Sequence, residues 1–309
     1  MPHLSVVIPV YKAENCLHEL HRQLSRVLSS LTSDWEVIYV EDCGGDRSWQ
    51  IIRELARADQ RVKGIQFSRN FGQHYGITAG LEASQGDYVV VMDCDLQQDP
   101  GFIPWLYSEA KDGYDMVLTQ VSDRKHATWR NWGARLYNSV VNFLTGRSFI
   151  SSRFTTLSLL SRPVVDAFLE IKDVHRHYIP ILDYLGFSKK IIEISHKNRF
   201  SGKSSYNFNR LVVLTINGII SQSNRLLYIT IALGFILVCM SLFASAYIVF
   251  NYFLSGYQSG WASTITVLLM LGGSLHIFLG IVGLYIGKIF DQVKQRPLFF
   301  IREKINFQS

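Results

Sequence analysis

Residues Val89–Gln97, with the sequence VVVMDCDLQ, form a short apolar run that ends in two carboxylates separated by one residue. Alternate side chains of an extended strand end point the same way, so Asp93, Asp95 and Gln97 are expected to present oxygen atoms to one point. Such a set suits a hard divalent cation, because these ions prefer oxygen ligands and often share them with a substrate diphosphate. An isolated Asp-x-Asp is more often a solvated turn, so the interpretation depends on its surroundings.

Strands and helices alternate along the N-terminal part of the chain. Apolar, β-rich runs predict strands at residues 4–10, 35–40, 62–67, 88–92 and 116–119, and periodic runs predict helices at 14–30, 47–58 and 75–83. This alternation predicts an α/β domain with a Rossmann-like, mostly parallel sheet and helices on both faces. Ligands of such sheets bind beyond the carboxyl ends of the strands. Because Asp93 and Asp95 fall at one such end and Glu41 and Asp42 at another, a binding site explains them better than a turn.

The chain changes in character after the fifth predicted strand. Two basic, polar segments are found at residues 121–155 and 196–206, a helix is predicted near 163–170, an apolar segment covers 178–185, and a strand is predicted at 190–194. Residues 207–225 follow, and within them apolar and polar residues alternate at helical spacing. This last segment is expected to form an amphipathic helix at a membrane interface.

Residues 226–287 contain no Asp, Glu, Lys or Arg, although 18% of the whole chain is charged. Two apolar stretches, about 226–254 and 264–287, are separated by a polar, Gly-rich segment. Each exceeds the roughly 20 residues that a helix needs to cross a bilayer. A buried helical pair would need a larger soluble core than the chain supplies, so a transmembrane hairpin is predicted.

The charges that flank the hairpin predict its orientation. Residues 288–309 carry five basic and two acidic side chains, whereas the segment between the apolar stretches is uncharged. Positive charges favour the cytoplasmic side, so both the N-terminal domain and this basic tail are expected there. The tail is expected to lie against anionic headgroups. No signal peptide precedes the first predicted strand, which agrees with this orientation.

Several motifs spread along the chain carry a resemblance to a known family. They are Ser5–Tyr11 (SVVIPVY), Ser68–His74 (SRNFGQH), Asp93–Gln97 (DCDLQ), Gly202–Tyr206 (GKSSY), Gly283–Ile289 (GLYIGKI) and Arg296-Pro297. Together they resemble family-2 glycosyltransferases of the GT-A fold. More narrowly, the chain resembles the membrane-anchored polyprenyl-phosphate glycosyltransferases, which include bactoprenol glucosyltransferases, dolichyl-phosphate mannose synthases and undecaprenyl-phosphate aminoarabinose-type transferases. The resemblance covers essentially the whole chain.

The resemblance implies a catalytic domain over residues 1–206 that binds a nucleotide-diphosphate sugar, with a UDP-sugar favoured. The nucleotide-binding residues that it implies are Pro9, Tyr11, Glu14, Glu41, Asp42 and Asp93. The metal ligands that it implies are Asp93, Asp95 and Gln97, which would hold Mg²⁺ or Mn²⁺ against the diphosphate and neutralise the leaving group. Glu14 could instead cap or solvate its helix, and that alternative stays open.

The acceptor that the resemblance implies is polyprenyl phosphate, and the location that it implies is the bacterial inner membrane. The acceptor's phosphate is ionised near neutral pH, so the attack needs cations more than a general base. The basic residues expected at the acceptor phosphate are Arg124, Arg130, Arg135, Arg199 and Lys203. Asp95, Arg124 and Lys203 are the candidates for a catalytic role. The expected product is an inverted, lipid-linked monosaccharide for cell-envelope glycans, and a homo-oligomer (a tetramer in related proteins) is expected, with no nucleic-acid partner.

The chain departs from the family pattern at three places. Residues 151–162 lack the acidic residue that relatives carry before Phe-Arg-Leu. If relatives use that carboxylate as a base, this chain uses Asp95 in its place or uses no base. Glu41 stands where relatives have the first Asp of an Asp-Asp pair, and Leu284 replaces a common Glu. Cys43 and Cys94 are expected to be packing substitutions. These departures bear on the identity of the donor more than on the class of reaction.

Two other functions remain compatible with the sequence. A processive polysaccharide synthase would carry Gln-x-x-Arg-Trp, and residues 222–226 have the Gln and Arg but no Trp. Two membrane spans are also few for a channel within one chain. The second alternative is a catalytically silent membrane scaffold or a partner in lipid-carrier translocation, against which the acidic residues retained at separate strand ends argue.

Overall fold

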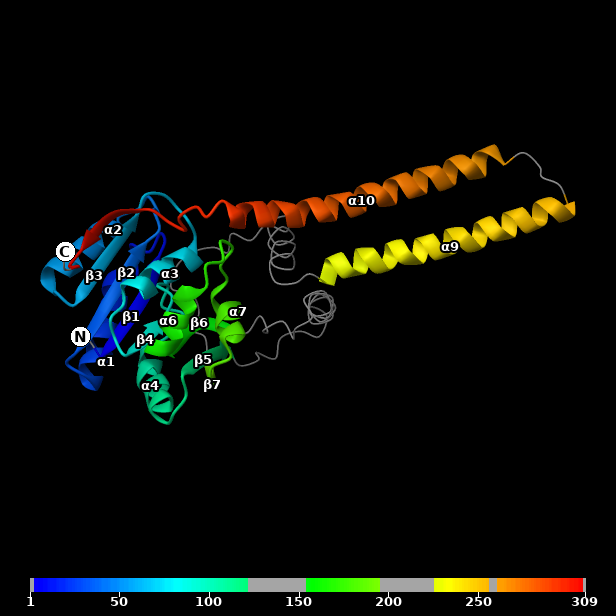
Figure 1. Cartoon of the computed structure of the whole chain (residues 1–309). Helices are drawn as coiled ribbons and strands as arrows, with labels where there is room; N and C mark the ends of the chain where they lie inside the picture. The colour runs from blue at the N-terminus through cyan, green and yellow to red at the C-terminus, as the bar shows by residue number, and fades with distance from the viewer. Residues whose placement is uncertain (1–2, 122–153, 195–224, 256–259, 308–309) are drawn as a thin grey trace, which may run out of the picture. The chain divides into compact units, whose positions relative to one another are not determined.

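The computed structural model describes residues 3–121, 154–194, 225–255 and 260–307. They belong to two compact units. One unit is an α/β domain that includes the segment from Arg296 onward, and the other contains two long helices (Figure 1). Each unit is considered by itself below. The predicted interfacial helix at 207–225 lies outside the described residues except for Arg225.

The α/β domain is built on a sheet of eight strands (Figure 1). The strands are β1 (Leu4–Val10), β2 (Trp35–Glu41), β3 (Val62–Phe67), β4 (Tyr88–Val91), β5 (Met116–Val121), β6 (Phe154–Ser161), β7 (Lys189–Ile194) and β8 (Ile301–Ile305). Their order across the sheet is β7-β5-β6-β4-β1-β2-β3-β8. Strands β1 to β4 are mutually parallel where they pair, and β5 is parallel to β7. The predicted Rossmann-like α/β fold is confirmed.

Helices cover both faces of this sheet. They are α1 (Leu17–Leu31), α2 (Ser48–Ala58), α3 (Gln73–Ala83), α4 (Ile103–Lys111), α6 (Arg162–Glu170) and α7 (Tyr178–Leu185), with a short 3-10 turn at Pro100–Phe102. Helices α1, α2 and α4 share one apolar core with the sheet, whereas α6 and α7 share the other. All seven residues of β1 and β2 are buried, as expected for central strands that are covered on both faces.

Helix α3 lies unusually close to the sheet because it presents glycine to β1. A Cβ atom added at Gly80 would come within 2.2 Å of a methyl carbon of Val7, and one at Gly76 within 3.2 Å of Pro9. The close approach brings the start of α3 beside the carboxyl ends of the central strands. Gln73, the first residue of this helix, is thereby placed next to the candidate site.

Two strands differ from the sequence-based expectation and make the sheet mixed. Strand β6 is inserted antiparallel between β4 and β5, in a segment for which the sequence analysis predicts no strand. Its buried residues are nearly continuous and include Ser158, whose hydroxyl bonds to that of Tyr178 at 2.7 Å. Because polar side chains are buried in pairs here, β6 lacks the apolar pattern by which a strand is recognised.

The second unexpected strand is β8, which lies in the predicted basic tail. It pairs antiparallel with β3 and completes that edge of the sheet. Glu303 accepts a hydrogen bond from the indole of Trp49 at 3.2 Å and forms an ion pair with Arg53. Residues 301–305 are thus part of the sheet of the α/β domain, and their alternating apolar and charged residues fit an edge strand.

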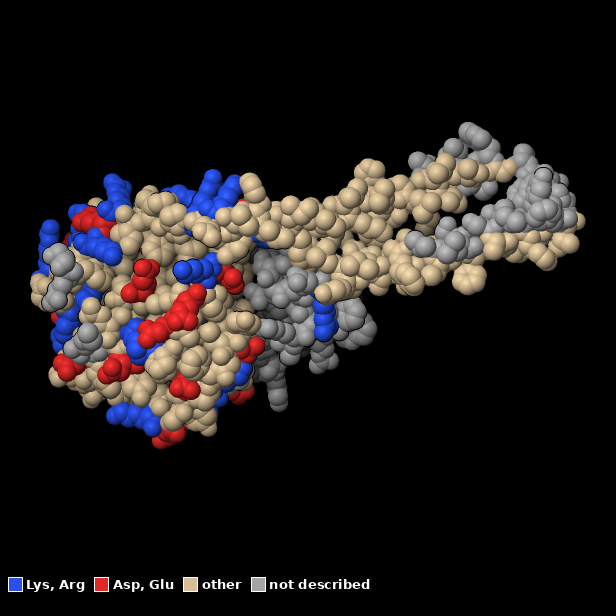
Figure 2. Space-filling model, viewed as in Figure 1, with Lys and Arg blue, Asp and Glu red and all other residues tan. Residues whose placement is uncertain are grey.

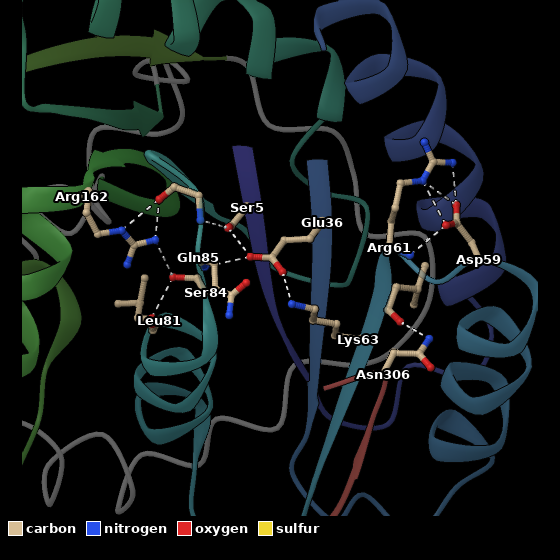
Figure 3. A network of polar contacts seen from close by, with 12 residues as sticks. Ser5, Glu36, Asp59, Arg61, Lys63, Leu81, Ser84, Gln85, Arg162 and Asn306 are labelled. Atoms are coloured by element: carbon tan, nitrogen blue, oxygen red, sulfur yellow. Dashed lines mark hydrogen bonds and ion pairs between the residues drawn. The ribbon is translucent and has the colours of Figure 1, made fainter. Parts of the chain in front are cut away.

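A buried polar network ties the beginnings of the strands together (Figure 3). Glu36 accepts hydrogen bonds from the hydroxyl of Ser5 at 2.6 Å and from the backbone of Gln85 at 2.8 Å, and it pairs with Lys63 at 2.6 Å. The guanidinium of Arg162 donates to the carbonyl of Gly86 at 2.9 Å. The Glu36 carboxylate therefore has a structural role. It lies at the opposite ends of the strands from the predicted ligand site.

The second unit contains α9 (Arg225–Ser255) and α10 (Trp261–Val293), which are mostly uncharged along their length (Figure 2). Large apolar side chains are exposed on both, such as Phe243 and Met270 at 79% and 71%. Exposed apolar surface of this extent indicates a membrane or a partner. Among the described residues, one segment, Met270–Val293, is long and apolar enough to span a bilayer, with a mean hydropathy of 1.7. The two-span hairpin stays a prediction.

Candidate active site at the carboxyl ends of the strands

The predicted acidic residues converge at one edge of the sheet. Val10 of β1 lies opposite Glu41 of β2, and β4 runs beside β1 and ends just before Met92-Asp93. Three neighbouring strands therefore deliver the Asp93 motif, the Pro9–Tyr11 segment and the Glu41-Asp42 pair to the same edge. This is where ligands bind in open α/β sheets.

Asp93 is held by two amide side chains. Its Oδ1 accepts from Gln73 Nε2 at 2.6 Å, and its Oδ2 accepts from Gln98 Nε2 at 3.0 Å. The Asp93 backbone N–H donates in turn to Gln98 Oε1 at 3.0 Å, so the buried Gln98 grips both ends of the residue. The register of β4 with β6 places Thr156 opposite, and its hydroxyl also bonds to the Asp93 carboxylate.

Burial, together with the neighbouring Asp95 carboxylate, raises the pKa of Asp93 to about 6, and the bonds from Thr156, Gln73 and Gln98 limit this rise. Two carboxylates compete for negative charge in a partly dehydrated place. A divalent cation would relieve that repulsion. A raised pKa of this kind is expected of a carboxylate in a cation site before the cation is bound.

Asp95 and Gln97 lie in a tight turn that follows the strand. Asp95 Oδ1 accepts from the backbone N–H of Gln97 at 3.1 Å, and Leu96 between them has a left-handed φ of 59°. The turn replaces the straight strand end assumed in the sequence analysis. It holds the Asp95 carboxylate against its own backbone, the arrangement known as an Asx turn.

The residues of this turn and strand end fit a divalent cation that shares its coordination with substrate. Within the described residues, no three His, Cys, Asp or Glu side chains are grouped as a complete protein-only metal site. A carboxylate oxygen has more than one lone pair, so Asp93 can accept an amide hydrogen bond and still bind a metal. Mg²⁺ is commonly bound by one or two carboxylates together with substrate phosphates and water, which matches this set.

Glu41 and Asp42 are both buried and bonded within the domain. Asp42 accepts the backbone N–H groups of Phe71 and Gly72 at 2.6 and 2.8 Å, and Glu41 accepts that of Gly44 at 2.7 Å. Burial raises the pKa of Asp42, and the two backbone N–H groups partly offset the effect. These carboxylates shape the loops that surround the predicted nucleotide pocket.

The remaining predicted nucleotide residues take different positions at this edge. Pro9 is buried against α3, whereas Tyr11 is 49% exposed with the Lys12 ammonium 5.4 Å from its ring centroid. Glu14 accepts the backbone N–H of Arg47 at 3.0 Å, just before α2 begins. Its contact is therefore with the start of the next helix and not with its own. The exposed Tyr11 ring is available to a ligand.

Five predicted residues lie outside the described part of the chain. They are Arg124, Arg130, Arg135, Arg199 and Lys203. The acceptor-phosphate assignment therefore stays a prediction. Conversely, Gln73, Gln98 and Thr156 are contacts of Asp93 that sequence reasoning missed, because amides and hydroxyls at these positions follow no spacing rule.

Cys43 and Cys94, the two cysteines expected to be packing substitutions, have different surroundings. Cys94, between the two aspartates, lies beside Cys16, whose thiol contacts the Cys94 carbonyl oxygen at 2.9 Å. The hydrogen bond with the Cys16 thiol and, after it, burial raise the pKa of Cys94. Cys43 is exposed and has a left-handed φ of 52°. Cys94 belongs to the turn Asp93–Gln97 (the carboxylate turn) and packs against the core of the domain. Its thiol is neutral near pH 7.

A mixed Rossmann-like sheet with paired carboxylates beyond its central strands is the GT-A arrangement of glycosyltransferases. The chain belongs to glycosyl transferase family 2, whose family model matches residues 5–169. It is a glycosyltransferase, and the resemblance read from its motifs is confirmed.

Relatives match nearly the whole chain. An uncharacterized glycosyltransferase, YkcC, of Bacillus subtilis is 32% identical, and the match covers 99% of this chain and 95% of that protein. An undecaprenyl-phosphate 4-deoxy-4-formamido-L-arabinose transferase of Pseudomonas fluorescens is 33% identical over 99% of this chain and 90% of that protein. The fold is also similar to that of glucosyl-3-phosphoglycerate synthase from Mycobacterium tuberculosis, crystallised with Mn²⁺ and UDP-glucose, with a TM-score of 0.51 and 18% identity over 72% of this chain and 79% of that one.

Proposed function

We propose that this protein transfers a single sugar from a nucleotide-diphosphate sugar to polyprenyl phosphate, with inversion at the anomeric carbon. The observation that carries the proposal is the convergence of Asp93 and Asp95 at the ligand-binding edge of the sheet, where burial and mutual repulsion raise the pKa of Asp93. Family membership supplies the class of reaction. The printed name of the Pseudomonas relative supports undecaprenyl phosphate as the acceptor.

The reaction forms a bond between an acceptor phosphate oxygen and the anomeric carbon, and it breaks the bond from that carbon to the diphosphate. The leaving group is the nucleoside diphosphate. A divalent cation bound by Asp93, Asp95 and Gln97 would neutralise the charge that develops on this group. Gln73 and Gln98 orient the Asp93 carboxylate for that task.

The acceptor phosphate needs little activation, since it is ionised near neutral pH. It does need positive charge around it, because it approaches another phosphate-bearing substrate. Arg124, Arg130, Arg135, Arg199 and Lys203 are proposed to supply this charge, with Arg124 and Lys203 nearest the reaction. Asp95 is the candidate base, if one is used, since Thr156 and its neighbours on β6 include no acid.

The membrane arrangement is part of the proposal. The apolar segment Met270–Val293 and helix α9, which is uncharged after Arg225, support a hairpin, with the catalytic domain and the last residues proposed on the cytoplasmic side. The acceptor's phosphate would then be presented at the same surface as the catalytic domain. The family resemblance further implies a homo-oligomer.

A transfer assay tests the proposed function. Membranes containing the protein would be supplied with undecaprenyl phosphate and, one at a time, UDP-glucose, a UDP-N-acetylhexosamine, GDP-mannose and a UDP-linked 4-formamido-arabinose. We expect one donor to yield a lipid carrying a single sugar, only when Mg²⁺ or Mn²⁺ is present. Products longer than one sugar would identify a processive synthase, and failure with every donor would favour a scaffold.

A further inference from the structure

A cavity of about 530 Å³ lies beyond the carboxyl end of β3, apart from the carboxylate turn. Its wall includes Arg69, Phe71, Tyr75, Arg296, Pro297 and Phe300. The volume falls within the range of about 300–1,000 Å³ that is usual for small-molecule sites. The cavity is lined by other residues than those predicted to bind the nucleotide and the metal.

Two segments distant in sequence form the cavity. The backbone N–H of Ser68, after β3, donates to the carbonyl of Phe300, just before β8, at 2.9 Å. Phe67 and Phe299 stack with ring centroids 5.1 Å apart. The pairing of β8 with β3 thus builds the site and fixes the positions of its walls.

The charges of the cavity are positive and available. Within the described residues, neither Arg69 nor Arg296 lies within ion-pairing distance of a carboxylate. The Arg69 guanidinium lies over the Phe71 ring, 4.3 Å from its centroid, which holds it at the wall. Asp42 is the nearby acid that interacts electrostatically with Arg69, but it is buried and bonded to two backbone N–H groups. A pair of guanidinium groups beside aromatic rings favours an anion, and above all a phosphate, that carries an apolar portion.

The chain also ties this cavity to the end of the apolar helix. Arg296 is three residues beyond Val293, where α10 and the apolar segment end. An extended chain covers at most about 3.6 Å per residue, so Arg296 is held within about 11 Å of that end. If the apolar segment crosses a bilayer, this arginine stays at the depth of the phospholipid headgroups.

We propose that this cavity binds the phosphodiester headgroup of an anionic membrane phospholipid such as phosphatidylglycerol. Arg69 and Arg296 contact the phosphate, and the Phe71 and Phe300 rings with Pro297 contact the glycerol portion. The proposal rests on the membrane span proposed for α10 and does not depend on which sugar is transferred. The bound lipid would join the β3–α3 loop to the segment that connects α10 with β8.

The test measures lipid binding to the full chain in detergent by native mass spectrometry, with phosphatidylglycerol, phosphatidylcholine and inorganic phosphate as probes. Arg69→Gln and Arg296→Gln are each expected to weaken phosphatidylglycerol binding about tenfold, the effect of losing one charge-assisted contact. Phosphatidylcholine binding should remain weak and unchanged. Arg296→Lys should retain part of the affinity, because it keeps the charge but loses the bidentate geometry.

Arg302→Gln is the matched control, since Arg302 is an exposed basic residue of β8 that does not line the cavity. An equal loss in Arg302→Gln would show general attraction by basic residues and overturn the proposal. Competition by inorganic phosphate as strong as that by the lipid would overturn the lipid assignment. If Arg69→Gln or Arg296→Gln raised the KM for the nucleotide sugar while leaving lipid binding intact, the cavity would belong to the donor site. An unchanged melting temperature confirms that each variant is folded.

Discussion

Two glutamines that belong to no recognised motif hold the Asp93 side chain in position. Gln98 is 1% exposed, and it both donates to the Asp93 carboxylate and accepts the Asp93 backbone N–H. Gln73 completes the support from the start of α3. The carboxylate that would face the metal is thus oriented from both sides, which keeps its reorganisation on binding small.

The variant Gln98→Leu tests this support. It removes one donor and one acceptor and leaves the Asp93 backbone N–H unpaired, a change that costs about 1–3 kcal/mol of folding stability. We also expect weaker Mn²⁺-dependent donor binding, because the carboxylate loses an orienting bond. Gln50→Leu on the exposed face of α2 is the control and should change stability by less than about 0.5 kcal/mol. If the wild type, Gln98→Leu and Gln50→Leu had equal unfolding midpoints and equal donor affinity, Gln98 would not support the Asp93 carboxylate.

His74 provides a pH test at the same scale. Burial, together with the nearby His177, 5.3 Å away between ring centroids, lowers its pKa to about 4. The folded protein therefore keeps His74 neutral while the unfolded chain protonates it near pH 6.5. The stabilisation is complete above pH 6.5 and is lost as the pH falls toward 4, by on the order of 3 kcal/mol.

The comparison must be made between the wild type and His74→Gln. Asp93 titrates in a similar range with the opposite sign, because its raised pKa lets the folded state take up a proton first. That contribution is common to both proteins and cancels in the difference. Chemical unfolding between pH 7 and pH 4.5 should show the stability difference shrinking as the pH falls. A difference independent of pH would contradict the buried neutral histidine.

At the scale of elements, six of the eight strands were predicted, and β6 and β8 were not. The central strands β1 and β4 follow from runs such as Leu4–Val10, since a strand buried on both faces reads as a nearly continuous apolar run. β6 buries Ser and Thr in hydrogen-bonded pairs, as Thr119 with Thr155 shows, so its sequence resembles a loop. The positions of the predicted strand ends were sufficient to locate the acidic site. The turn at Leu96 and the contacts of the two glutamines depend on tertiary packing and could not be predicted.

The last strand is the part of the tail that was not predicted. The charges of the tail predict a headgroup contact, and the alternation within residues 301–305 also fits the edge of a sheet. Asn306, after β8, donates from its side-chain amide to the carbonyls of Ala56 and Val62 at 2.7 and 2.8 Å. It has a left-handed φ of 61°, which asparagine tolerates better than most residues. The end of the chain is thereby fastened to α2 and β3.

Asn306→Ala should lower the stability of the catalytic domain by about 1–3 kcal/mol, because two carbonyls lose their donor. Arg302→Ala on the exposed side of β8 serves as the control and should have little effect. Thermal unfolding of the purified full chain checks both. A melting temperature of Asn306→Ala equal to that of the wild type would mean that this attachment is not needed for stability.

At the scale of the whole molecule, we propose that the catalytic domain and the end of the chain lie on the same side of a membrane. The uncharged segment between the two apolar stretches is expected on the other side. Alkaline phosphatase, which is active only outside the cytoplasm, should be inactive when fused after residue 309 and active when inserted within residues 255–260. A green fluorescent protein fused after residue 309 should fluoresce. Active phosphatase at the C-terminus would contradict the hairpin.

The most direct test of the central claim compares the wild type, Asp95→Asn and Asp99→Asn in the transfer assay with undecaprenyl phosphate, the productive donor and a titration of Mn²⁺. Asp99 is four residues further along, where its carboxylate accepts the backbone N–H of Gly101 at 2.9 Å, a bond that asparagine can also make. Asp99→Asn should therefore retain activity. Asp95→Asn should fold normally but lose transfer by roughly 100-fold or more, as expected when a group that stabilises developing charge is removed. If Asp95→Asn transferred sugar at the wild-type rate with the same Mn²⁺ dependence, the carboxylate turn would not be the metal-diphosphate site and the account would be wrong.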